Sequence, residues 1–129
     1  MYCLDTNILI DYFHGDSKTI SFVNSIQEQE ICVTPITLME LYAGCSIHDK
    51  RQAMYAMIED FLTEVSIIEF NIEVCKRYGE LYNILRSKGK MPEVPDMMIA
   101  ALCLKHNVIL ITSNKKHFEN IPGLKIECL

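Results

Sequence analysis

The chain has 129 residues, of which 50% are hydrophobic and 22% are charged, and its formal net charge is −5. This composition excludes a disordered chain, and no apolar run approaches the roughly 18 residues that cross a bilayer. The acidic balance argues against a broad phosphate-binding surface, so a nucleic-acid partner would require cations from a local basic strip or a bound metal. The length predicts one domain over residues 1–129.

Short apolar runs alternate with longer segments of helical period along the whole chain. In chain order, we predict a strand over 2–5, helices over 8–15 and 16–29, a strand over 31–34, helices over 35–45 and 50–63, a strand over 65–70, helices over 72–87 and 95–105, and strands over 108–112 and 124–127. Gly15 is expected to end the first helix, and Pro35 and Pro95 each to open one.

Five short strands separated by helices predict an α/β fold, with a central parallel sheet covered by helices on both faces. In such three-layer sheets, ligands bind outside the carboxyl ends of the strands. The residues that follow each strand are therefore the first candidates for a functional site.

The cysteines and the amino-terminal segment bear on the cellular compartment. The first ten residues include Asp5 and lack a basic stretch, so we predict no signal peptide, a cytoplasmic location and no membrane partner. The six cysteines form no C-x-x-C pair and lie in apolar segments, which favours buried free thiols over disulfides or zinc ligands. They are Cys3, Cys32, Cys45, Cys75, Cys103 and Cys128.

Three carboxylates stand alone in apolar segments. Asp5 is the only charged residue among positions 1–10, Glu40 the only one between Glu30 and Asp49, and Asp96 the only one between Glu93 and Lys105. Isolated carboxylates are rarely buried unless they are paired or bind a metal. Asp5 ends the first strand, and the small or apolar neighbours of Glu40 predict that its helix face points into the protein.

Simpler explanations exist for each carboxylate taken alone. Asp5 could cap the helix that follows it, and Asp96 could complement a helix N-terminus. Glu40 lies too deep in the helix opened by Pro35 to close a capping box with Thr37. Together with Asn114, which follows the fourth strand, the three acids offer the hard oxygen ligands that suit Mg²⁺ or Mn²⁺.

Four segments resemble the PIN domain and, within that superfamily, the VapC-type toxins of toxin–antitoxin pairs. They are LDTNILIDY (4–12), TLMELYAG (37–44), PDMMIAALCLKHNVILITSN (95–114) and HFENIPGLKI (117–126), in the family's order and spacing. The resemblance implies a Mg²⁺-dependent endoribonuclease, with Mn²⁺ as a substitute, that leaves a 5′-phosphate and a 3′-hydroxyl.

The resemblance also implies residue roles. Asp5 and Asp96 would bind the principal metal, while Glu40 would bind it directly or through water, or orient the attacking water. Asn114 corresponds to a fourth polar position that is often Asp, and His117 stands where the family commonly has an acid, so one metal or two remain alternatives. Asn7, Thr112 and Ser113 are candidates for holding a carboxylate or touching phosphate, with ordinary turn and cap hydrogen bonding as an equal alternative.

Two groups of basic residues are candidates for contact with a nucleic acid. Lys115 and Lys116 follow the fourth strand and could meet an RNA backbone, whereas the strip of Arg86, Lys88 and Lys90 is expected to be solvated surface. His48, His106 and His117 lack metal-ligand spacing. The resemblance further implies a homodimer and a small cognate antitoxin that covers the active-site groove.

Other functions fit the sequence less well. A dehalogenase-like phosphatase would need an Asp where Asn7 stands, and a receiver domain would need an acidic pair and a phosphorylatable Asp ending a later strand. A non-catalytic PIN scaffold that acts only through antitoxin or RNA binding stays open, because Asn114 carries no charge.

Overall fold

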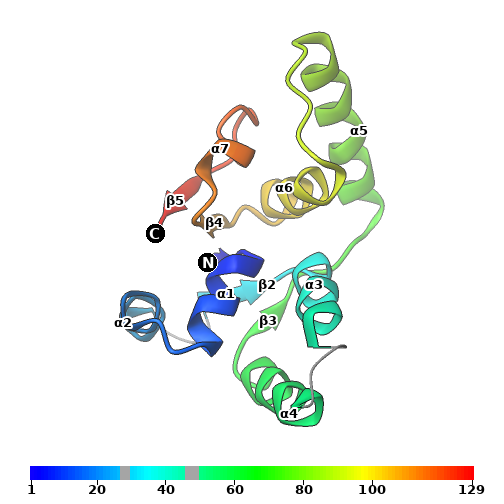
Figure 1. Cartoon of the computed structure of the whole chain (residues 1–129). Coiled ribbons are helices and arrows are strands. Elements are labelled where there is room, and N and C mark those ends of the chain that lie inside the picture. The colour runs from blue at the N-terminus through cyan, green and yellow to red at the C-terminus, as the bar shows by residue number, and fades with distance from the viewer. Residues whose placement is uncertain (27–29, 46–49) are drawn as a thin grey trace.

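A computed structural model describes residues 1–26, 30–45 and 50–129 of the chain. Its centre is a five-stranded sheet in which every strand pairs in parallel with its neighbours, in the order β3-β2-β1-β4-β5 (Figure 1). The strands are β1 (Tyr2–Leu4), β2 (Ile31–Val33), β3 (Ser66–Ile67), β4 (Ile109–Thr112) and β5 (Ile126–Cys128). The predicted α/β class and parallel sheet are confirmed.

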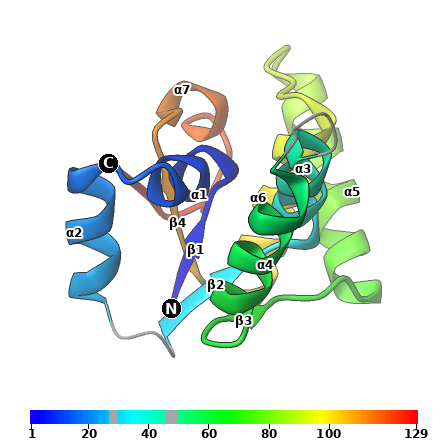
Figure 2. The same cartoon turned by 60° about the horizontal axis from the view of Figure 1, so that its bottom comes forward.

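Helices connect the strands and cover the sheet on both faces. They are α1 (Thr6–Phe13), α2 (Ser17–Ser25), α3 (Pro35–Cys45), α4 (Arg51–Leu62), α5 (Ile72–Ser87), α6 (Val94–His106) and α7 (Lys115–Phe118). Figure 2 shows α2 on one side of the strands and α5 and α6 on the other. The predicted end of the second helix, at Gln29, lies outside the described residues.

Successive side chains of the strands point to opposite faces of the sheet and pack into two separate hydrophobic cores. Cys3 and Leu110 pack with α5 and α6 in one core, while Leu4 and Ile111 pack with α1, α2 and α4 in the other. A strand points successive side chains to opposite faces, so adjacent apolar residues are buried on both sides only when both faces are covered. The predicted three layers are thereby confirmed.

Helix ends follow local signals in the sequence. The helix after β1 begins at Thr6, two residues earlier than predicted, because Asp5 occupies its N-cap. Gly15 follows α1 with a φ of +86°, and Asn107 ends α6 in the left-handed region with a φ of +53°. The predicted starts at Pro35 and at the segment around Pro95 are confirmed to within one residue.

Two strands predicted at the edges of the sheet are wrong in extent, and one short helix was missed. The strand predicted over 65–70 is only Ser66–Ile67, because an exposed edge strand has one neighbour to pair with. The last strand is shifted to Ile126–Cys128, beyond a turn at Gly123 with a φ of +78°. The short helix α7 was not predicted; its residue Phe118 is buried in the core and anchors it.

All six cysteines are free, but the expectation that all are buried is wrong for two of them. Cys75 and Cys128 are exposed, whereas Cys3, Cys32, Cys45 and Cys103 are buried. Cys75 lies on the face of α5 that points to solvent, and Cys128 lies in the edge strand β5. No helix in the described ranges combines the length and apolar character needed to cross a membrane.

Candidate active site

The carboxyl ends of the two central strands bring Asp5 and Thr112 together. Leu4 and Ile111 are paired in the β1–β4 register, and the Asp5 backbone N–H donates to the Ile111 carbonyl at 3.0 Å. The next residues are Asp5, which follows the end of β1, and Thr112, the last residue of β4, so both lie at the same edge of the sheet. There the Thr112 hydroxyl donates a 2.7 Å hydrogen bond to Oδ2 of Asp5.

Each oxygen of the Asp5 carboxylate is held by a hydrogen bond. Oδ1 accepts from the backbone N–H of Thr6 at 2.8 Å, and the residue is only 7% exposed. The Thr112 hydroxyl that holds Oδ2 also accepts from the backbone N–H of Asn114 at 3.0 Å. A carboxylate oxygen has room for further partners, so the fixed group can still accept a ligand on its remaining lone pairs. Asp5 does cap α1, and capping leaves that capacity free.

Asp96 lies in the first turn of α6, and its side chain is 20% exposed. Burial raises the pKa of this carboxyl above its ordinary value, and the ring of His117, with Nδ1 3.3 Å from Oδ2, opposes the rise. The charges of Asp5, Glu93 and Glu40 raise the pKa further. Asp5 and Glu40 are therefore among the charges that reach Asp96.

The exposure of Glu40 differs from the prediction. The residue was predicted to face the interior, but it is exposed on α3, as are Ala43 and Gly44 on the same side of the helix. Ile36 and Thr37, one turn earlier, are buried, so Glu40 lies where this face of the helix passes from the core to solvent. Its side chain lines a pocket of 610 Å³ together with Gly44 and Ile10. An exposed carboxylate at the wall of a pocket is available to a ligand.

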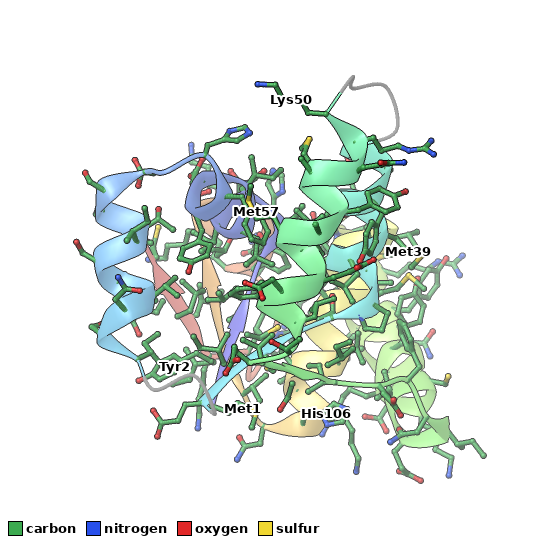
Figure 3. The ribbon with its side chains drawn as sticks, turned by 90° about the horizontal axis from the view of Figure 1, so that it is seen from below. Met1, Tyr2, Met39, Lys50, Met57 and His106 are labelled. Carbon is green, nitrogen blue, oxygen red and sulfur yellow. The ribbon has the colours of Figure 1, made fainter. Side chains whose placement is uncertain are left out.

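The other predicted residues surround this edge. Asn7 and Ser113 are exposed, and Asn114 is half-buried at the start of α7, where its side chain makes no capping hydrogen bond. Lys115 and Lys116 are exposed on α7. In Figure 3, the amino end of the sheet is marked by Met1, Tyr2 and His106, and Lys50 lies at the opposite end of the molecule.

The donor set suits a hard divalent cation. Within the described ranges, no three His, Cys, Asp or Glu side chains are gathered closely enough to hold an ion by themselves. Mg²⁺ does not require such a cage, because it keeps several waters and binds through one or two carboxylates plus substrate phosphate. Asp5 and Asp96 are the carboxylates that could bind such an ion, and a cation beside them would neutralise their charges.

Two residues near the site had no predicted role. The Thr6 hydroxyl, next to Asp5, is buried and has no hydrogen-bond partner among the described residues. A buried hydroxyl without a partner costs free energy. His117 contacts Asp96 across 21 residues, a relationship that sequence spacing cannot reveal.

Known proteins resemble this chain in sequence and in fold. The PIN domain family profile matches residues 2–124. The chain is 33% identical to Ribonuclease VapC2 of Rickettsia felis over 98% of its own length and 96% of the relative's, and 27% identical to the tRNA(fMet)-specific endonuclease VapC of Salmonella typhimurium over the same shares. The fold is similar to VapBC2 of Rickettsia felis bound to a promoter DNA fragment, with a TM-score of 0.89 at 30% identity, covering 99% of this chain and 98% of that one.

The match covers nearly the whole chain and includes all three carboxylates. Two independent likenesses, of sequence and of fold, agree on one group of proteins. The chain therefore belongs to the PIN domain family and, within it, to the VapC group.

Proposed function

We propose that this chain is a Mg²⁺-dependent endoribonuclease, the toxin of a VapBC-type toxin–antitoxin pair, and that it acts in the cytoplasm as one domain over residues 1–129. The observation that carries the proposal is the Asp5 carboxylate, which the Thr112 hydroxyl and the Thr6 backbone N–H hold at the carboxyl end of β1, with Asp96 within reach of its charge. Relatives named ribonuclease and endonuclease over nearly the full length support the choice of RNA.

The roles of the residues follow from their surroundings. A bound Mg²⁺, or Mn²⁺ in its place, lowers the pKa of water and stabilises negative charge on phosphoryl oxygens. Asp5 and Asp96 would hold the ion, and Thr112 keeps the Asp5 carboxylate in one orientation through its 2.7 Å hydrogen bond. Glu40, which is exposed, would bind the ion directly or through water, or orient the attacking water.

The neutral side chain of Asn114 bears on the number of metal ions. An amide oxygen can bind a cation but adds no negative charge, so a second ion would be held weakly. Asn7 and Ser113 are exposed near the same edge and can contact the phosphate of the substrate. Of the two lysines that follow the fourth strand, Lys116 is the candidate cation for the RNA backbone, because it lines the pocket beside Asp96 and Lys115 does not.

An antitoxin partner fits the groove beside Glu40. The 610 Å³ pocket there is lined mainly by apolar side chains of α1, α3 and α4, including Ile10, Leu41 and Met57. Met57 is 46% exposed and Ile10 36% exposed, which is unusual for apolar side chains without a partner. A segment of the cognate antitoxin that fills this groove would also block access to Glu40. Structures of VapBC complexes are among the similar folds.

A homodimer is the second proposed assembly. An apolar pocket of 270 Å³ between α5 and α6 is lined by Phe70, Val74, Tyr78 and Met98. Ile72, beside it, is 73% exposed. A second copy of the chain that packs this surface against its own equivalent would bury these side chains in a two-fold interface.

The test is cleavage of total cellular RNA by the purified protein with Mg²⁺ or Mn²⁺. We expect discrete products that disappear with EDTA and in the Asp5→Asn variant, and end-mapping of these products identifies the target. Binding of Mg²⁺ in calorimetry without any cleavage would instead support the non-catalytic scaffold. Absence of both cleavage and metal binding would overturn the proposed site.

A further inference from the structure

A further pocket opens beside Asp96. Its volume is 390 Å³, within the range of about 300–1,000 Å³ that small-ligand sites occupy. Asp96 and His117 line one part of it, and Lys90 and Lys116 also line it. The site carboxylate therefore opens into a pocket that also carries two lysines.

The two lysines come from segments far apart in the sequence. Lys90 lies in the chain between α5 and α6, and Lys116 lies on α7; Figure 1 shows the α5–α6 connection descending on the side of α5 that faces α7. Neither lysine has a carboxylate ion-pair partner in the part of the chain that the structure describes. Both are exposed and available to an anion from outside.

The charges of the pocket favour a phosphate once the metal is bound. Asp96 is neutralised by the cation it holds, which leaves two ammonium groups facing the single free carboxylate of Glu93. The rest of the chain is acidic, with a formal net charge of −5, so an RNA strand is attracted only where cations gather locally. Met91 and Asn120 add an apolar and an amide surface in the same pocket, suited to a ribose and a base edge.

We propose that this pocket binds the RNA strand next to the cleaved phosphodiester, with Lys90 and Lys116 contacting its backbone phosphates. The inference rests on the proposed function, because it places the strand relative to a metal on Asp96. It assigns Lys90 a role that the sequence did not, since its strip was expected to be solvated surface. It also separates Lys116 from Lys115, which follows the same strand but does not line the pocket.

The chain supplies matched controls for both lysines. Lys88 precedes Lys90 by two residues and Lys115 precedes Lys116 by one, and both controls are exposed and lie outside the pocket lining. Each control removes the same charge from nearly the same place. A general effect of net charge would therefore change both members of a pair equally.

The experiment measures binding of a fluorescein-labelled single-stranded RNA of mixed sequence to the Glu40→Gln protein in Mg²⁺, which keeps Asp5 and Asp96 for the ion and lacks the carboxylate proposed to orient the attacking water, so that the probe stays intact. Affinity is followed by anisotropy as a function of salt concentration. We expect Lys90→Ala and Lys116→Ala each to weaken binding and to reduce the slope of log affinity against log salt by about 0.7, the value for one phosphate contact on a single strand. Lys88→Ala and Lys115→Ala should leave the slope unchanged, and Lys90→Arg should restore it.

Equal changes within each pair, or no change in any variant, would overturn the proposal. Thermal unfolding and Mg²⁺ calorimetry on the same variants must match the parent protein, which excludes a folding or metal-site effect. Failure of the proposed function gives a different result. In that case the wild-type protein would not cleave RNA, while the difference between pocket lysines and their neighbours would persist in binding.

Discussion

The Thr112 hydroxyl holds Oδ2 of Asp5 at 2.7 Å, although 107 residues separate the two in the chain. The contact exists because β4 lies beside the central strand β1, parallel to it, so that both strands end at the same edge. A candidate metal ligand is thus oriented by the strand beside it rather than by its own segment. Such supporting contacts keep a ligand in a productive orientation.

Replacing Thr112 by Val should therefore weaken Mg²⁺ binding by about 10- to 100-fold, the usual effect of losing a group that orients a metal ligand. Calorimetric titration measures this, and the RNA cleavage rate at limiting Mg²⁺ should fall with it. Thr19 offers a matched control, because its buried hydroxyl donates an equal 2.7 Å bond to Asp16, far from the site. Thr19→Val should leave the affinity for Mg²⁺ unchanged; an equal loss there would remove the special role of Thr112.

Asp96→Asn should abolish RNA cleavage and leave the metal-free protein at least as stable as the wild type. The pKa of Asp96 is raised by burial and by neighbouring carboxylates, so its charged form opposes folding. An acid with a raised pKa in the folded state favours folding while it is protonated, and this contribution is lost as the pH rises through that pKa. Melting temperatures without metal should therefore favour the variant at neutral pH, and the difference should vanish in acid.

The same experiment distinguishes the capping explanation of Asp96. If the carboxylate served only to stabilise the N-terminus of α6, Asp96→Asn would lower the melting temperature at neutral pH. The exposed Asp11 on α1 is a suitable control, since Asp11→Asn removes a charge of the same type outside the site.

Asn114→Asp should lower the Mg²⁺ concentration needed for half-maximal cleavage, on the order of tenfold, because affinity follows the number of charged ligands. Half-saturation is read from initial cleavage rates across a Mg²⁺ series. Asn24→Asp, on the exposed side of α2, adds the same charge elsewhere and should have no effect. Unchanged half-saturation in Asn114→Asp would place this residue outside the metal site.

Phe118→Ala should reduce the free energy of unfolding by about 3–5 kcal/mol, the cost of removing a large buried aromatic side chain. Phe118 is 1% exposed and joins the short helix α7 to the core beneath α6. Urea unfolding gives the value, and Ile84→Ala, at a side chain that is 40% exposed, should change it far less. A loss below about 1 kcal/mol would mean that α7 is not anchored by this residue.

The layered fold could be predicted because the local signals agree with the tertiary structure. Helices that open at Pro35 and near Pro95, and the glycine after α1, are fixed by backbone chemistry within a few residues. The alternation of buried helices and apolar strands then determines a parallel sheet. The short helix α7 and the edge strands could not be predicted, since their extent depends on what they pack against. Phe118 reaches the core only in the folded chain.

The candidate site could also be predicted from the sequence only in part. The three acids could be found because each is alone in an apolar segment, and the strand ends explain where Asp5 lies. The exposure of Glu40 could not be predicted, because small neighbours such as Gly44 indicate a close-packed face or an open one equally well. Contacts between distant segments, such as that of His117 with Asp96 and the two lysines beside it, depend on how α7 folds back.

The central claim is that the carboxylates at the sheet edge hold a divalent cation that cleaves RNA. Its most direct test is the initial rate of RNA cleavage by the purified protein across a Mg²⁺ series, with the wild type, Asp5→Asn and Asp96→Asn side by side. We predict a rate that rises and saturates with Mg²⁺ in the wild type, and none in EDTA or in either variant. Cleavage that persists in EDTA, or in either variant, would contradict the account.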